Sequence, residues 1–191
     1  MNRDLGFYLV SMELPSLLKF LAGLVTQLGD IGFIILFLVF FYLLDGKRFS
    51  LTDNRSKSFF YLSTIFVVSV VLTFFLKNLF RLPRPPSASA EVAPIWMKGW
   101  IEEIYISMTT GSGYGFPSGH SLISTSFYLG LAHVVKKGTR KVRFSLALLI
   151  VTVVCLTRIL LGVHYLLDVA VGFLIGLFLF FAITLLIKPA E

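Results

Sequence analysis

Long apolar runs dominate the pattern of hydrophobic and polar positions, and charged residues interrupt them only at wide intervals. The stretches 58–76 and 169–187 contain no charged residue at all. A helix needs about 20 mostly apolar residues to cross the hydrocarbon core of a bilayer. The pattern predicts an all-α, polytopic membrane helix bundle that forms one domain over residues 1–191. Five spans are expected, near residues 28–45, 58–80, 117–135, 143–163 and 166–187.

The first 28 residues differ, because charged residues and Pro15 break up their apolar positions. Their apolar side chains recur at the i, i+3, i+4, i+7 spacing of one helical face. This stripe consists of Leu14, Leu17, Leu18, Leu21, Leu24, Val25 and Leu28. It predicts that residues 1–28 form amphipathic helices at the outer interface, with a sixth span at about 5–27 as the alternative. Glu13 and Lys19 interrupt any signal-peptide core, so no cleaved signal is expected.

Composition supports a membrane protein and excludes several other classes. Hydrophobic residues make up 57% of the chain and charged residues 14%, whereas globular domains have about 45–50% and 25%. This excludes a soluble enzyme, a disordered chain and a secreted disulfide scaffold. Cys155 is the only cysteine, so no internal disulfide can form. The net charge of +7 is too sparse for a nucleic-acid partner, and no obligate protein partner is evident.

The distribution of charge predicts an orientation. One side of the predicted bundle holds the 46–57 and 136–142 loops and the C-terminus, with ten basic residues against three acidic ones. The other side balances seven against seven. The positive-inside rule makes the first side cytoplasmic, in a plasma (inner) membrane. The ten basic residues are Lys47, Arg48, Arg55, Lys57, Lys136, Lys137, Arg140, Lys141, Arg143 and Lys188.

Ionisable residues gather at the outer ends of four predicted spans, where their burial is costly and therefore indicates function. Three cations around one point predict an anionic ligand, and the planar fork of arginine suits phosphate. Pro83 and Pro85 hold Arg84 on a stiff extended segment. The cluster consists of Lys77, Arg84, His120, Arg158, His164 and Asp168.

Two local patterns sharpen this prediction. The glycine-rich segment 111–119 leads into an apolar run with Ser118 as a good N-cap, and a helix N-terminus attracts anions. His164 and Asp168 are four residues apart, so a helix places them on one face. Asp168 can then accept from one ring nitrogen and leave the other unprotonated. Each pattern alone also fits a purely structural role, such as a snorkelling cation or a helix start.

Together these residues resemble the three-part signature of the type-2 phosphatidic acid phosphatase superfamily, which includes vanadium haloperoxidases and glucose-6-phosphatase. The resemblance spans residues 77–168. One departure is Thr157 where the family usually has serine, and the hydroxyl is kept. The three motifs are Lys77-x6-Arg84-Pro85, Pro117-Ser-Gly-His120 and Arg158-x5-His164-x3-Asp168.

The resemblance implies a role for each residue. His164 would be the nucleophile that forms a phosphohistidine, Asp168 would orient it, and His120 would protonate the leaving oxygen. No metal or other cofactor is expected, because three fixed cations can neutralise a phosphoryl group. The phosphate-binding residues would be Lys77, Arg84, Ser118, Gly119 and Arg158.

The resemblance also implies a reaction class. The expected activity is hydrolysis of a lipid mono- or diphosphate at the extracytoplasmic face: polyprenyl diphosphate, phosphatidylglycerophosphate, phosphatidic acid or a sphingoid phosphate. A haloperoxidase is not expected, because those enzymes are soluble and this chain is predicted to be embedded in the membrane. A lipid phosphotransferase using the same phosphohistidine, or a non-enzymatic membrane protein with a vestigial site, are the alternatives. The loop 86–116 is expected near the site, as a wall or as an aromatic anchor through residues such as Trp96 and Trp100.

Overall fold

The computed structural model describes residues 15–45, 50–89 and 98–187, and the elements within them are all helical. The all-α prediction is therefore confirmed. The basic residues Lys47, Arg48 and Lys188, Trp96 and the first 14 residues of the predicted interfacial segment lie outside the described residues. The elements are α2 (Ser16–Thr26), η1 (Gln27–Gly29), α3 (Ile31–Leu44), α4 (Arg55–Phe80), η2 (Pro86–Ser89), α5 (Trp100–Thr109), α6 (Gly119–Val134), α7 (Arg140–Leu160) and α8 (Leu166–Ile187).

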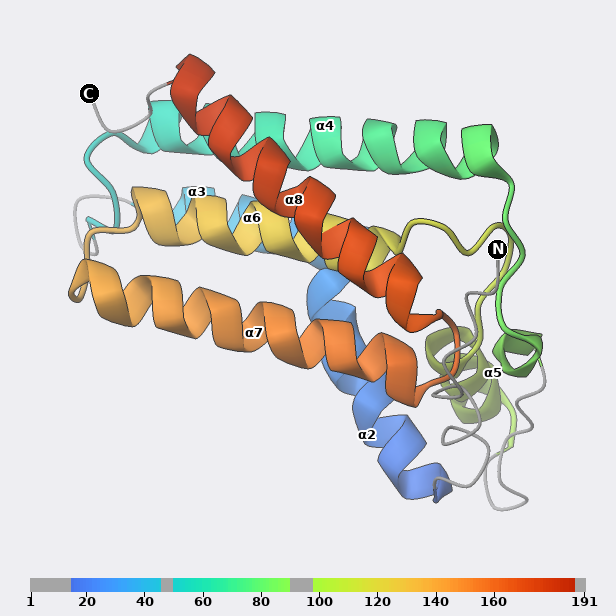
Figure 1. Cartoon of the computed structure of the whole chain (residues 1–191). Helices are drawn as coiled ribbons and strands as arrows, with labels where there is room; N and C mark the ends of the chain where they lie inside the picture. Colours follow the sequence, from blue (N-terminus) through green and yellow to red (C-terminus); the bar gives the residue numbers. More distant parts are fainter. Residues whose placement is uncertain (1–14, 46–49, 90–97, 188–191) are drawn as a thin grey trace.

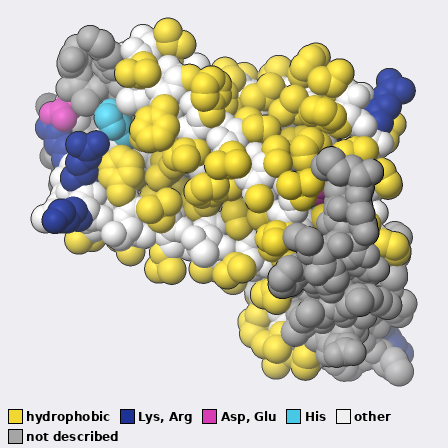
Figure 2. Space-filling model, in the orientation of Figure 1, with side chains coloured by type: hydrophobic (Ala, Val, Ile, Leu, Met, Phe, Trp, Pro, Cys, Tyr) yellow, Lys and Arg dark blue, Asp and Glu magenta, His cyan; other side chains and the backbone are white. Residues whose placement is uncertain are grey.

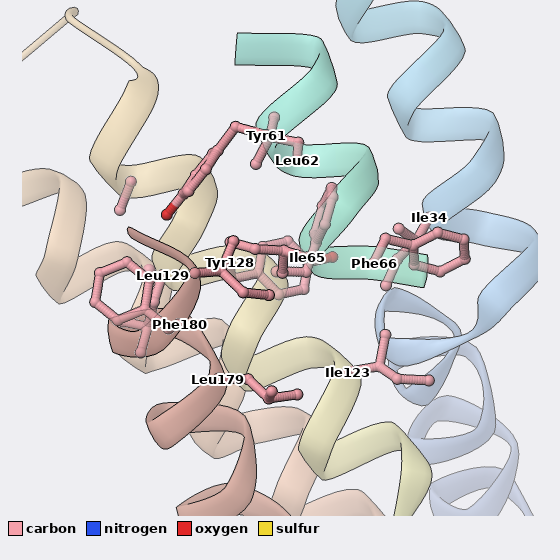
Figure 3. Packing of buried hydrophobic residues seen from close by; sticks show 14 of the residues in the cluster. Ile34, Tyr61, Leu62, Ile65, Phe66, Ile123, Tyr128, Leu129, Leu179 and Phe180 are labelled. Atoms are coloured by element: carbon pink, nitrogen blue, oxygen red, sulfur yellow. The ribbon is translucent and has the colours of Figure 1, made fainter. Parts of the chain in front are cut away.

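Helix α6 forms the centre of the bundle. It packs against α4, α7 and α8, and α8 crosses the others at an angle (Figure 1). Tyr61 and Ile65 of α4, Leu129 of α6 and Phe180 of α8 meet in the buried hydrophobic cluster, which Ile34 of α3 completes (Figure 3). Helix α2 lies outside this group of helices and packs on α5 and α7. This arrangement brings the end of α4, the start of α6 and the start of α8 to one end of the molecule.

Each predicted span largely coincides with one helix, although α3 has only 14 residues and α6 only 16, and side-chain caps explain several of the helix starts. Asp30 accepts from the Gly32 N–H at 2.8 Å at the start of α3. Asn54 accepts from the Lys57 N–H at 3.0 Å at the start of α4. Such caps satisfy amide groups that a helix leaves without a partner.

Within the part of the chain that the structure describes, three helices are long and apolar enough to cross a membrane by themselves: α4, α7 and α8. The pair Ser16–Gly29 and Ile31–Leu44, bent by 54°, is a candidate fourth span. Helix α6 has only 16 residues. Hydrophobic side chains cover the middle of the visible face, and basic side chains gather at the end near the turn between α6 and α7 (Figure 2). The chain is an integral membrane protein.

Helix α2 exposes its apolar stripe and buries its small residues. Leu17 is 60% exposed and Leu21 is 47% exposed, whereas Gly23 and Thr26 are buried. A Cβ atom at Gly23 would lie 3.1 Å from Met108 Cβ of α5. The leucines therefore face the surroundings of the protein, and the small face of the helix lies against its neighbours.

Helices α6 and α8 approach so closely that their backbones touch. A Cβ atom at Gly172 would lie 2.6 Å from the Ser118 carbonyl oxygen, and one at Gly176 would clash with the Leu122 carbonyl oxygen. The Ser118 N–H also donates to the Asp168 carbonyl oxygen at 2.9 Å. Small residues permit such close helix packing in membranes, and here the packing joins the second and third motifs.

Candidate active site

A pocket of about 840 Å³ lies at the end of the bundle where the three motifs meet. Its walls come from the α2–α3 bend, α4, α5, the glycine-rich loop, the start of α6 and the end of α7. Two predicted site residues, Ser118 and Asp168, are fully buried behind these walls. The predicted site residues that line the pocket are Lys77, Arg84, Gly119, His120, Arg158 and His164.

Arg84 is held by three acceptors from two segments. Its Nε donates to the Ser112 carbonyl oxygen at 2.9 Å, and its Nη1 donates to the Val163 carbonyl oxygen at 2.9 Å. The same Nη1 lies 3.0 Å from His164 Nε2. Because a guanidinium has only donors, this contact makes Nε2 the unprotonated nitrogen of His164. The stiff segment between Pro83 and Pro85 thus presents Arg84 directly to the imidazole.

The glycine-rich loop orients both cations of the first motif through its backbone. Lys77 Nζ donates to the Tyr114 carbonyl oxygen at 2.7 Å. A Cβ atom at Gly111 would lie 2.7 Å from Arg84 Nη1, and one at Gly115 would lie 3.1 Å from Arg84 Cγ. Sequence analysis did not identify these carbonyl contacts. The glycines at 111 and 115 were the sequence feature that indicated a close approach of the loop backbone to another group.

His164 and Asp168 form the pair that their spacing predicts. His164 Nδ1 lies 3.5 Å from Asp168 Oδ2, and both side chains are almost completely buried. The same carboxylate oxygen accepts from the Tyr165 N–H at 3.1 Å, which fixes its position. Burial, with the charges of Arg84, Arg158 and Lys77, holds the pKa of His164 well below its usual range. The imidazole is therefore neutral, with its proton on Nδ1 and with the Nε2 lone pair directed at Arg84.

The start of α6 brings the second motif to the pocket. The predicted N-cap is confirmed: the Ser118 Oγ accepts from the Ser121 N–H at 3.5 Å and from the Ser121 hydroxyl at 3.0 Å. A Cβ atom at Gly119 would lie 2.9 Å from Thr73 Cγ2, so only glycine fits this close to α4. His120 follows in the first turn and lines the pocket.

Arg158 is only 4% exposed although it carries a charge. Its Nη1 donates to the Thr26 hydroxyl at 3.0 Å, and its Nε is buried without a hydrogen-bond partner among the described residues. Sequence analysis did not single out Thr26, because nothing in the spacing relates residues so far apart.

The segment 86–116 holds η2 and α5. Ile104, Ser107 and Met108 of α5 line the pocket beside the glycine-rich loop. Within the described residues, no group of three or more His, Cys, Asp or Glu side chains is placed to hold a metal ion. Part of the pocket wall is apolar and includes Val70, Phe74 and Ile123.

Comparisons with known proteins connect the chain to one family. A profile of the PAP2 superfamily matches residues 57–190. Phosphatidylglycerophosphatase B of Bacillus subtilis (strain 168) is 33% identical over 96 residues, which are 46% of this chain and 47% of that protein. The chain thus spans about half the length of this curated relative.

Two crystal structures have a similar fold. That of a transmembrane PAP2-type phosphatidylglycerolphosphate phosphatase from Bacillus subtilis matches with a TM-score of 0.70, over 97% of this chain and 86% of that chain, at 22% identity. That of Aquifex aeolicus LpxE matches with a TM-score of 0.66, over 93% and 91%, also at 22% identity. At this identity the likeness concerns the fold alone.

Proposed function

Because the chain belongs to the PAP2 superfamily, we propose that it is a membrane-integral lipid phosphate phosphatase that works through a phosphohistidine on His164. The observation that carries the proposal is the pocket itself, in which three cations surround a neutral imidazole. Positioning and charge neutralisation are the main requirements of phosphoryl transfer. The pocket offers both through Lys77, Arg84 and Arg158.

In the proposed first step, the Nε2 lone pair of His164 attacks phosphorus and the bond to the lipid oxygen breaks. His120 enters this step as the imidazolium, a state that the negative charge of the bound phosphate favours, and gives its proton to the departing oxygen. Asp168 stabilises the positive charge that develops on His164. In the second step His120 accepts a proton from water, whose oxygen attacks phosphorus as the N–P bond breaks. The hydrogen bond from Arg84 Nη1 to His164 Nε2 must break before the attack, because it occupies the lone pair that attacks phosphorus. Arg84 then donates to the phosphoryl oxygens instead.

We propose a lipid as the substrate, because the pocket joins a cationic end to apolar walls. Val70, Phe74 and Ile123 suit hydrocarbon chains, and the cations suit the phosphate. The name of the Bacillus subtilis relative makes phosphatidylglycerophosphate the first candidate. Polyprenyl diphosphate, phosphatidic acid and sphingoid phosphate are the other lipids to compare.

We further propose five spans, with α6 as the short central one, and a pocket that faces the extracytoplasmic side. Arg55 and Arg140 begin α4 and α7, and Lys136 follows the end of α6, all at the end of the bundle remote from the pocket. This placement supports the orientation under the positive-inside rule. An N-terminal tag accessible from outside supports five spans, whereas a tag accessible only from inside supports six.

The test is phosphate release from a panel of lipid phosphates in detergent with EDTA. We expect His164→Ala to lower kcat by about 10⁴-fold or more, as loss of a nucleophile does. His133→Ala is the matched control, since His133 packs between Tyr61 and Phe180, outside the pocket. Full activity in His164→Ala, or a strict requirement for magnesium, would refute the mechanism. Transfer of phosphate to an added lipid alcohol, without free phosphate, would indicate a phosphotransferase.

A further inference from the structure

The one described hydrogen bond of the Arg158 side chain goes to a residue outside the matched part of the family. Thr26 stands at the end of α2, and the profile match begins only at residue 57. We propose that Thr26 is a positioning residue for phosphate binding, whose hydroxyl orients the Arg158 guanidinium toward the phosphoryl group. This inference rests on the proposed function.

The geometry of the pair carries the inference. Thr26 is completely buried and Arg158 is 4% exposed, and Arg158 Nη1 donates to Thr26 Oγ1 at 3.0 Å. A guanidinium has five N–H donors in a rigid plane. One anchored nitrogen therefore restricts the whole group and leaves other donors, including Nε, for a ligand in the pocket that Arg158 lines.

The backbone that carries Thr26 is fixed at two further points. The Tyr128 hydroxyl donates to the Leu28 carbonyl oxygen at 2.8 Å. A Cβ atom at Gly29 would lie 2.9 Å from Val154 Cγ1 and 3.3 Å from the His120 carbonyl oxygen. The bend between α2 and α3 thus packs directly on the helices that carry Arg158 and His120. A hydroxyl on this bend has a defined position relative to both.

The chemistry of the acceptor also matters. A hydroxyl oxygen orients a guanidinium without neutralising it, whereas a carboxylate at the same place would compete with phosphate for the charge. Thr26 therefore serves the phosphate site better than an acidic residue would. If Thr26 had only a packing role, its shape alone would matter, and valine, which has the same shape, would replace it without loss of phosphate binding.

The experiment compares Thr26→Val, which keeps the shape, with Thr26→Ser, which keeps the hydroxyl. Thr64→Val is the matched control, because the half-buried Thr64 lies outside the pocket and donates to the Phe60 carbonyl oxygen of its own helix. We expect Thr26→Val to lower kcat/KM about tenfold and to weaken orthovanadate binding, measured by calorimetry, by a similar factor. Thr26→Ser and Thr64→Val should stay within about twofold of wild type.

The second measurement is a double-mutant cycle with Arg158→Ala. If Thr26 acts through Arg158, Thr26→Val causes no further loss of vanadate affinity or activity in that background. An equal loss in both backgrounds, or wild-type vanadate affinity in Thr26→Val, would overturn the inference. Wild-type protein that binds vanadate but hydrolyses no lipid phosphate would refute the proposed function alone. Wild-type protein that binds no vanadate would overturn both.

Discussion

The cations in the pocket and those at the opposite end of the bundle are held in different ways. In the pocket, Lys77 and Arg84 donate to backbone carbonyl oxygens, and Arg158 donates to a hydroxyl. At the opposite end, Lys136 pairs with the Asp53 carboxylate in an exposed salt bridge. Two arginines there lie over aromatic rings: Arg55 is 4.5 Å from the Tyr42 ring centroid and Arg140 is 5.6 Å from that of Phe144.

This difference teaches how a protein keeps a positive charge available. A carboxylate partner cancels much of the field of a cation, whereas a neutral oxygen fixes its direction and leaves the field in place. The exposed contacts at the other end each contribute little to stability, because solvent screens them. Among the described residues, the direct hydrogen-bond partners of the pocket cations are thus neutral groups, while the carboxylates of Asp30 and Asp168 lie nearby.

Removing one cation from each end should give the largest difference between the two ends. Arg84→Ala should lower kcat/KM by about 10²–10³-fold, since it removes a fixed donor from the phosphoryl group. Arg140→Ala should leave kcat/KM within about twofold and cost less than about 1 kcal/mol of stability. Phosphate release and thermal unfolding in detergent measure the two quantities. Equal losses of activity in both variants would remove the distinction between the two ends.

The next effect tests whether the glycine-rich loop orients Arg84. Gly111→Ala should lower kcat/KM by about 10- to 100-fold, because the new methyl group meets Arg84 Nη1 and displaces it. Gly113→Ala is the matched control: its φ is +67° and nothing lies within 4 Å, so it should cost roughly 1 kcal/mol of stability and little activity. A control as inactive as Gly111→Ala would point to loop folding instead of arginine placement.

The smallest effect concerns the proton on His164. Burial and the nearby cations disfavour the charged imidazole, so its pKa lies below the ordinary value of 6.5. When the pH is lowered, an exposed histidine becomes charged first. His164 should stay neutral to a lower pH, with its single ring proton on Nδ1. The chain has three histidines, so ¹⁵N chemical shifts of labelled protein, assigned with single His→Gln variants, can follow each one. A proton on Nε2 would contradict the contact with the Arg84 guanidinium, and titration at or above pH 6.5 would contradict the effect of burial and the nearby cations.

The sequence predicted the helices of the bundle well, because apolar runs between charged residues are a strong signal. Helix α8 has the expected bounds, and α4 and α7 begin only three residues before theirs. Helix α5 was treated only as part of the 86–116 loop, because Glu102 and Glu103 interrupt its apolar pattern. The five-span count stays a prediction, since α6 is short for a membrane crossing.

The sequence predicted those parts of the site whose chemistry is carried by side chains. Six charged or titratable residues in three motifs were found by sequence, and five of them line one pocket, with Asp168 directly behind His164. The carbonyl oxygens of Ser112 and Tyr114 carry no side-chain signal, because every residue has one. Thr26 is 132 residues from Arg158, and only the folded chain shows that they meet. Roles assigned through the resemblance stay predictions until the variants are measured.

The contact of Gly172 and Gly176 with the backbone of α6 has a consequence for how the enzyme tolerates its surroundings. At these two glycines the backbones lie in direct contact, which leaves little compressible side-chain volume between the helix that carries His120 and the helix that carries Asp168. A thinner bilayer or a different detergent would first disturb the outward leucines of α2, and only later the spacing of the reacting groups. Catalysis should therefore vary less with lipid composition than the tilt of the outer helices does.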